Sequence, residues 1–380
     1  MTEQFTLKPV YGEQFVGRKE MLEGMLREIR NPKSNTGFCL HGRRRVGKTS
    51  LLRELEHELE GDKIVVAYLS LYELADLSLK TFIEQLSATV LEAFRRKGAI
   101  PFEYAVRVLI DSPSEVISSA LSKIQVGAEL SEELRFFLEF RKGKQGNHTE
   151  AAKRAFSLGE KLAQSTGMKF VLILDEFPEI LKLENGMQLV KMLRTAHEGH
   201  RSTAVIISGS ERKTLEAVAL DSASPFYRQL VPKNVSPFSF EETREFLRKY
   251  GMELHESSAR RMHELTGGLP FYLQFIGRSV SITGNVDGAV KEFITQEGNL
   301  FFADEFEKLS AKEGIIVRAM ANGASSPTEI STASGEPVTS VSSYLVSLQG
   351  KGVAVKAGRA AYALNDALFS LWLRERHSHA

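Results

Sequence analysis

The stretch Gly42-Arg43-Arg44-Arg45-Val46-Gly47-Lys48-Thr49 matches the pattern G-x-x-x-x-G-K-[ST] and follows a short apolar run. In this pattern the glycines let the backbone curl so that successive N–H groups point at phosphate oxygens, and the helix that follows adds the positive end of its dipole. We expect Lys48 to reach the β- and γ-phosphates and Thr49 to place its hydroxyl on Mg²⁺. The stretch therefore predicts a phosphate-binding loop.

The segments on either side of this loop support the prediction. Thr36 to His41 is short and apolar, as expected of a strand that is covered on both faces. The residues after Thr49 place leucines at helical spacing, and Ser50 opens this helix. The alternative is a glycine-rich turn that holds arginine and lysine at the surface. The strand and helix favour a P-loop within an α/β fold.

A second apolar run, Phe170 to Leu174, ends in two acids, Asp175 and Glu176. Such a run is typical of a central parallel strand, and ligands bind at the carboxyl ends of these strands. We expect Asp175 to hold Mg²⁺ through its water shell and Glu176 to polarise the water that attacks the γ-phosphate. The alternative is a solvated strand end before the helix breaker Pro178.

A further β-branched run, Ser202 to Ser210, predicts another strand of the sheet. A hydroxyl at its end would face the γ-phosphate from the neighbouring strand. Ser208 and Ser210 are therefore candidate nucleotide sensors, although simple turn formation explains them equally well.

Length and charge describe a globular protein without a strong overall field. The chain has 380 residues, enough for two or three domains, with 49 lysines and arginines against 48 acids. Its one cysteine, Cys39, excludes an intrachain disulfide, and no apolar stretch approaches the ~18 to 20 residues that span a bilayer. We expect a cytoplasmic protein without a membrane partner.

The pattern along the chain predicts three domains: a P-loop core over residues 1–238, a helical lid over 239–305 and a winged helix over 306–380. The winged helix is predicted from three helical segments followed by an alternating stretch around Gly358 that is typical of a hairpin. The segment 98–166 is less clear. It includes an expected strand over Ile124 to Leu130 and an expected exposed loop over Arg141 to His148.

Whether the winged helix binds double-stranded DNA stays open. Its expected recognition helix, residues 336–348, contains no lysine or arginine and one acid, Glu336. A helix that binds DNA normally offers basic or amide side chains to bases and phosphates. Docking against a protein, or against the ATPase core, agrees equally well with this composition.

Five segments, in this order, resemble the archaeal-type ATPase family, a STAND-like branch of the AAA+ P-loop ATPases that is related to origin-recognition-type initiators. The segments are Phe15-Val-Gly-Arg-Lys-Glu20, His41 to Leu52, Val171 to Phe177, Ile206 to Ser210 and Thr266-Gly-Gly-Leu-Pro-Phe-Tyr-Leu273. The resemblance implies an α/β P-loop sheet with a helical lid and a C-terminal winged helix. It also implies that ATP or ADP binds together with Mg²⁺.

The resemblance assigns roles to residues that are otherwise only turns and helix starts. The turn Gly268 to Pro270 would close over the nucleotide from the lid. The family often has Pro-Leu-Tyr-Gly-Arg after the sensor strand, whereas this chain has Pro225-Phe-Tyr-Arg-Gln229. The arginine of this chain, Arg228, is therefore displaced by one position. A role as an arginine finger and an ordinary surface position both agree with the sequence. By the resemblance, Val16, Gly17 and Arg18 line the adenine pocket. The other residues expected to contact the nucleotide are Gly42, Arg43, Arg44, Arg45, Val46, Gly47, Lys48, Thr49, Ser50 and Pro270.

Three functions agree with this sequence. The first is an ATP-hydrolysing switch in which nucleotide state sets the position of the winged helix. The second is a nucleotide-dependent DNA-binding protein of the initiator or mobile-element kind. The third is a scaffold that holds ATP or ADP without turnover and presents its C-terminal domains to a protein partner. The oligomeric state stays open.

Overall fold

The computed structural model describes residues 5–99, 147–210 and 212–377, together with 132, 133, 136, 137, 139, 140 and 143. The chain divides into two compact units. We call one the sheet unit, which comprises Arg18–His41 and Lys48–Asn234. We call the other the helical unit, which comprises Met1–Gly17, Gly42–Gly47 and Val235–Ala380. The loop Gly42–Gly47 thus groups with the C-terminal part of the chain.

A five-stranded parallel sheet forms the centre of the sheet unit, in the order β2-β3-β4-β1-β5. Its strands are β1 (Gly37–His41), β2 (Ile64–Ser70), β3 (Lys169–Asp175), β4 (Thr203–Gly209) and β5 (Leu230–Asn234). The sequence patterns above predicted β1, β3 and β4, and these are confirmed. Strand β5 was not predicted. It contains Pro232, which lacks an N–H and is tolerated because β5 lies at the edge of the sheet.

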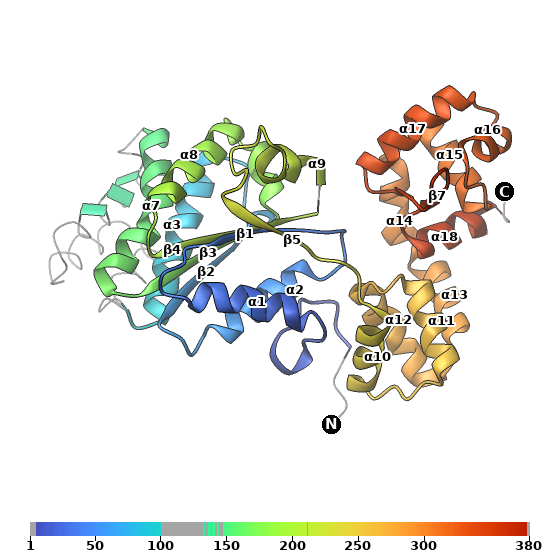
Figure 1. Ribbon diagram of the computed structural model, residues 1–380, viewed down its shortest axis with the longest axis horizontal. Coiled ribbons are helices and arrows are strands. Elements are labelled where there is room, and N and C mark those ends of the chain that lie inside the picture. The colour runs from blue at the N-terminus through green and yellow to red at the C-terminus, as the bar shows by residue number, and fades with distance from the viewer. Residues whose placement is uncertain are drawn as a thin grey trace. The chain divides into compact units, whose positions relative to one another are not determined.

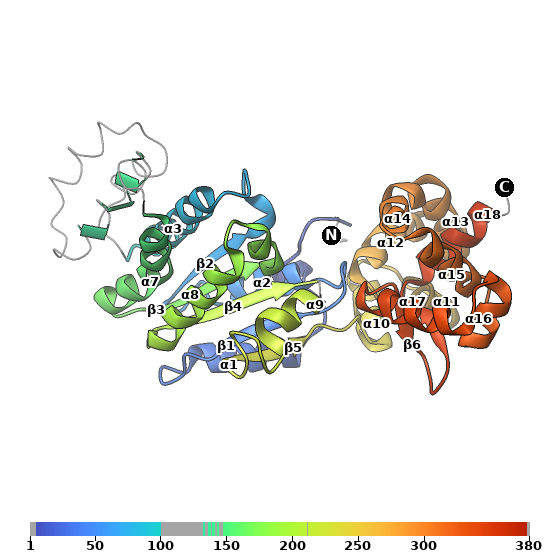
Figure 2. The same cartoon turned by 90° about the horizontal axis from the view of Figure 1, so that it is seen from above.

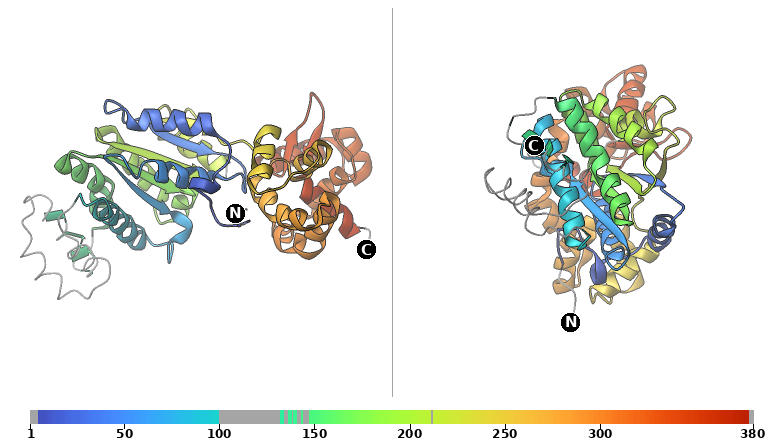
Figure 3. Two further views of the ribbon diagram at one scale, coloured as in Figure 1. Left: turned by 90° about the horizontal axis from the view of Figure 1, so that it is seen from below. Right: turned by 90° about the vertical axis from the view of Figure 1, so that its left-hand side faces the viewer.

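Helices cover both faces of this sheet (Figure 1). On one face lie α1 (Lys19–Arg30) and α2 (Lys48–Glu58), which Figure 3 shows from below. On the other face lie α3 (Leu79–Arg96), α7 (His148–Thr166) and α8 (Gly186–Gly199). Shorter pieces are the 3₁₀ turns Gly12–Gln14, Leu71–Glu73 and Phe177–Lys182, the helix α9 (Arg212–Leu215) and a π-helical turn, Glu216–Leu220.

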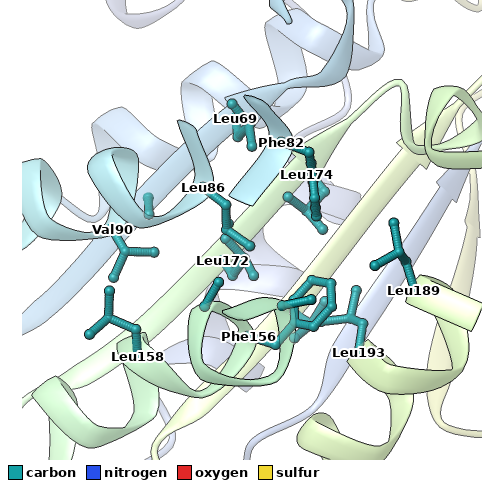
Figure 4. Packing of buried hydrophobic residues seen from close by; sticks show 14 of the residues in the cluster. Leu69, Phe82, Leu86, Val90, Phe156, Leu158, Leu172, Leu174, Leu189 and Leu193 are labelled. Atoms are coloured by element: carbon teal, nitrogen blue, oxygen red, sulfur yellow. The ribbon is translucent and has the colours of Figure 1, made fainter. Parts of the chain in front are cut away.

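The core of the sheet unit lies between the strands and α3, α7 and α8. Phe82 and Leu86 of α3 and Phe156 of α7 pack against Leu172 and Leu174 of β3 (Figure 4). All of these side chains are almost fully buried. This burial holds the carboxyl end of β3, and with it the acidic pair, in a fixed place.

The helical unit contains helices and one hairpin. Its elements are α10 (Phe240–Lys249), α11 (Glu256–Thr266), α12 (Pro270–Thr283), α13 (Val286–Gln296), α14 (Gly298–Glu307), α15 (Ala311–Ala321), α16 (Pro327–Ser334), α17 (Val338–Gly350), β6 (Ala354–Lys356), β7 (Tyr362–Leu364) and α18 (Ala367–His377). Serine caps open two of these helices, since Ser239 and Ser326 each form a capping box with the glutamate three residues on. Strands β6 and β7 pair antiparallel, as predicted, and Figure 2 shows their turn extending beyond the neighbouring helices.

Some predictions fall outside the described residues. These are the strand over Ile124 to Leu130 and most of the loop from Arg141 to His148. The division of residues 235–380 into a lid and a winged helix stays a prediction. Within the described part of the chain, none of the helices combines the length and the apolar character needed to cross a membrane.

Candidate nucleotide-binding and hydrolysis site

The loop after β1 has the backbone shape that its sequence pattern predicts. Arg45 and Gly47 adopt positive φ angles of 65° and 89°, and Val46 between them is fully buried. A glycine meets this requirement at residue 47 without the steric cost of a side chain. Alternating right- and left-handed residues turn successive N–H groups to one side, which makes an anion-binding concavity. The next residue along the chain, Lys48, begins helix α2.

The buried end of β3 carries a carboxylate that accepts four hydrogen bonds. Asp175 is only 2% exposed. Its Oδ2 accepts from the Thr49 hydroxyl at 2.7 Å and from the Tyr68 hydroxyl at 2.6 Å. Its Oδ1 accepts from the Ser208 hydroxyl and, at 3.0 Å, from the backbone N–H of Glu176. Thr49 and Ser208, which the sequence placed in one site with Asp175, therefore both contact this carboxylate.

Glu176 lies beside this carboxylate in a left-handed conformation with a φ of 51°. The Ser210 hydroxyl donates to its side chain, at 3.2 Å from each carboxylate oxygen. Burial raises the pKa of Glu176, the positive charge of Lys48 opposes this shift, and the neighbouring Asp175 adds to it. A carboxylate with a raised pKa accepts a proton more readily than an ordinary one, which suits a general base. The sterically unfavourable φ at this residue is the kind of local strain found at functional sites.

The oxygen groups at this site fit a magnesium ion. Mg²⁺ prefers oxygen ligands, keeps several waters, and is usually bound through one or two carboxylates together with substrate phosphates. The Thr49 hydroxyl donates a hydrogen bond to Asp175, so the lone pairs of its oxygen stay available for a cation. Among the described residues, no group of three or more His, Cys, Asp or Glu side chains is arranged to hold a metal ion by itself.

The side chain of Arg45 is bound within the helical unit. Its guanidinium donates to the Tyr272 hydroxyl at 2.7 Å and lies 3.5 Å from the Glu305 carboxylate. Four aromatic rings surround it, with their centroids 5.3 to 5.8 Å from the guanidinium carbon. The rings belong to Phe271, Tyr272, Phe301 and Phe302. We call these rings with Glu305 the Arg45 cage.

The turn expected to line the adenine pocket and the turn expected to close over the nucleotide both lie next to Phe238 of the helical unit. A Cβ on Gly17 would lie 3.0 Å from the Phe238 ring and 2.7 Å from Glu242 Oε1, so this close approach requires glycine. The Phe238 N–H donates to the Gly268 carbonyl at 2.8 Å. Pro270 is the first residue of α12. The structure therefore brings the Val16–Gly17 turn and the Gly268 turn to the same phenylalanine.

The remaining predicted residues are more dispersed. Arg18 precedes α1 with a φ of 57°, Ser50 lies in α2, Arg43 is half-buried and Arg44 is exposed. Arg228 is exposed, with its guanidinium carbon 5.3 Å from the centroid of the Tyr227 ring. Within the described part of the chain it forms no ion pair with Asp175 or Glu176.

Two contributions were missed by sequence reasoning. Tyr68, on β2, was not among the predicted site residues, and a hydroxyl in an otherwise apolar strand was the one available signal. Arg45 was predicted only as a nucleotide contact within the loop. Its side-chain partner Tyr272 lies 227 residues away, so no local pattern connects the two.

A strand, phosphate loop and helix in a parallel sheet, with a buried aspartate and a glutamate at the end of β3, define a P-loop ATPase. The chain belongs to the family described as "ATPase domain predominantly from Archaea", whose model matches residues 15–276. This confirms the family resemblance inferred from the five motifs. The protein is thus a P-loop ATP-hydrolysing enzyme.

Solved structures show the same fold at low sequence identity. The Walker-type ATPase Paby2304 of Pyrococcus abyssi is 22% identical, with a TM-score of 0.69 over 97% of this chain and 99% of that chain. The ORC2 protein of Aeropyrum pernix, in ADPNP–ADP complexes, is 13% identical, with a TM-score of 0.59 over 99% of each chain. No curated protein matches the sequence.

Proposed function

We propose that this ATPase is a molecular switch in which the nucleotide bound at the loop sets the conformation of the C-terminal segments. The observation that supports it best is the Arg45 cage, because one residue contributes both its backbone to the phosphate loop and its side chain to α12 and α14. A change in the loop around the phosphates would move the guanidinium. The residues of the cage must then either move with the guanidinium or lose contact with it.

The cage extends to the last helix through hydrogen bonds. The Tyr272 hydroxyl, which accepts from Arg45, donates to Asp366 Oδ2 at 2.6 Å. The other carboxylate oxygen of Asp366 accepts from the N–H groups of Leu368 and Phe369 at 3.0 and 3.1 Å, in the first turn of α18. Arg45 is thus connected through two side chains to the start of α18. Such a contiguous hydrogen-bonded path is a physical basis for coupling two sites.

The hydrolytic roles follow from the chemistry of the side chains. We assign Lys48 to the β- and γ-phosphates and Glu176 to the proton of the attacking water. Thr49 and Asp175 would hold Mg²⁺, which neutralises phosphate charge when it is bound. Ser208 would orient Asp175. Val16, Gly17 and Arg18 are proposed to line the adenine pocket, and Pro270 to close over the nucleotide. An arginine finger role for Arg228 is also a proposal, and its exposed position agrees with it.

The switch is tested by variants that separate binding from turnover. Lys48→Ala should lose nucleotide binding in calorimetry, and Glu176→Gln should bind ATP without single-turnover hydrolysis. Hydrogen exchange at residues 366–369 should then differ between Glu176→Gln with ATP and wild type with ADP. Wild-type turnover by Glu176→Gln would contradict the role of that residue. Identical exchange in the two states would exclude the switch and favour the scaffold.

Nucleotide-dependent DNA binding is a second candidate. It is supported by the order of three helices, α15, α16 and α17, followed by the β6–β7 hairpin, which is the order that a winged helix over residues 306–380 would have. Against it, α17 (Val338–Gly350) exposes mostly serine, threonine and valine side chains, with one amide, Gln349, and no lysine or arginine. A DNA-binding surface would therefore have to involve the hairpin or the C-terminal helix.

A further inference from the structure

The four hydrogen bonds to Asp175 use all of its acceptor capacity. An ionised carboxylate has about four lone-pair sites, two on each oxygen. Thr49 and Tyr68 donate to Oδ2, whereas Ser208 and the Glu176 N–H donate to Oδ1. The carboxylate is also nearly inaccessible to solvent. A further donor, such as a metal-bound water, can reach Asp175 only if one of the four donors leaves.

The four donors differ in their freedom to leave. The N–H of Glu176 is fixed by the backbone that follows β3, and Ser208 is fully buried within β4. The Thr49 hydroxyl can keep its bond to Asp175, because its lone pairs stay available to a cation. Tyr68 is the exception, because it is half-buried on β2 and carries its hydroxyl at the end of a long side chain.

The contacts of Tyr68 aim its hydroxyl at the carboxylate, to which it donates at 2.6 Å. The guanidinium carbon of Arg53 lies 3.5 Å from the centroid of the tyrosine ring. This contact holds the ring on one face, while the hydroxyl points at the carboxylate.

We propose that Tyr68 stands in for a metal-bound water at Asp175: its hydroxyl satisfies the carboxylate in the metal-free state and withdraws when Mg²⁺ binds with nucleotide. Tyr68 is thus a positioning residue that opposes metal binding. The inference depends on the magnesium site proposed above. If Tyr68 only held Asp175 in position, it would strengthen metal binding. A hydroxyl that occupies the place of the metal-bound water weakens metal binding instead.

The Tyr68→Phe variant separates these two effects, since it removes one hydroxyl and keeps the ring. Without metal, Asp175 loses a donor, so the melting temperature of the variant should fall. In Mg²⁺, the wild type must first break the hydrogen bond from Tyr68 to Asp175, whereas the variant has no such bond to break. The gain in nucleotide affinity caused by Mg²⁺ should therefore rise roughly tenfold, the equivalent of one net hydrogen bond.

The experiment titrates a non-hydrolysable ATP analogue by calorimetry, in Mg²⁺ and in EDTA, and compares the ratio of the two affinities. Tyr344→Phe, in α17 of the helical unit, is the matched control and should keep the wild-type ratio. An unchanged or smaller ratio in Tyr68→Phe overturns the inference. A wild type that binds the analogue equally with and without metal overturns the magnesium site and this inference with it.

Circular dichroism checks that Tyr68→Phe is folded. If it is not, Arg53→Met takes its place, because this change frees the ring and retains the hydroxyl. A looser ring leaves Asp175 more easily, so the affinity ratio should again rise above that of the wild type. A ratio at or below the wild-type value in Arg53→Met then overturns the inference.

Discussion

Replacing Arg45 with alanine tests the Arg45 cage directly. The change removes a charge-assisted hydrogen bond to Tyr272, with a net value of about 1.5 to 3 kcal/mol. It also removes cation–π contacts of about 0.5 to 2 kcal/mol. The ion pair with Glu305 adds little, because its side chains are only 19% and 32% exposed and the cost of desolvating both charges offsets much of their attraction. These terms overlap in one network and do not add, so we expect a loss of about 2 to 3 kcal/mol in the cage.

Hydrogen exchange measures this loss locally. A reduction of about 2 to 3 kcal/mol in the free energy of opening increases the exchange rate by roughly 30- to 150-fold. We expect the increase in the amides of α12 and α14 next to the cage, and at the start of α18 through Asp366. Arg278→Ala is the matched control, since Arg278 is an exposed arginine on α12.

One result would refute this reasoning. If Arg45→Ala exchanged like the wild type in α12, α14 and α18, the guanidinium would contribute nothing to the cage. The double variant Arg45→Ala/Tyr272→Phe refines the test. Its effect should be smaller than the sum of the two single effects, because both changes remove the same hydrogen bond.

The other predictions concern pH and DNA. Burial lowers the pKa of His200 to about 4 from an ordinary 6.5, with Glu160 opposing the shift. The unfolded state therefore binds more protons between these values, and stability should fall by up to about 3 kcal/mol as pH falls through this window. Melting temperatures of wild type and His200→Gln check this, since the variant should show a smaller fall. Because α17 lacks basic side chains, we expect duplex DNA to bind weakly, and tight, steeply salt-dependent binding would contradict this.

Much of the fold was predictable because its signals are local. The residues before Gly42 and before Asp175 form unbroken apolar runs, which predict buried parallel strands, and both were confirmed. Strand β5 was missed because it carries Pro232 and is largely exposed, so it has no unbroken apolar run. Its identity as a strand comes from pairing with β1, which no pattern within its own residues records.

The candidate site likewise has one part that local sequence patterns predict and another that depends on packing. The phosphate loop and the acidic pair belong to the first part, because backbone curvature, helix start and strand end are properties of neighbouring residues. Only the tertiary structure decided that Tyr68 shares Asp175 with Thr49, across 107 residues, and that Arg45 turns away from the loop toward Tyr272. Such contacts depend on how strands and helices pack, and packing brings together residues whose separation along the chain carries no signal.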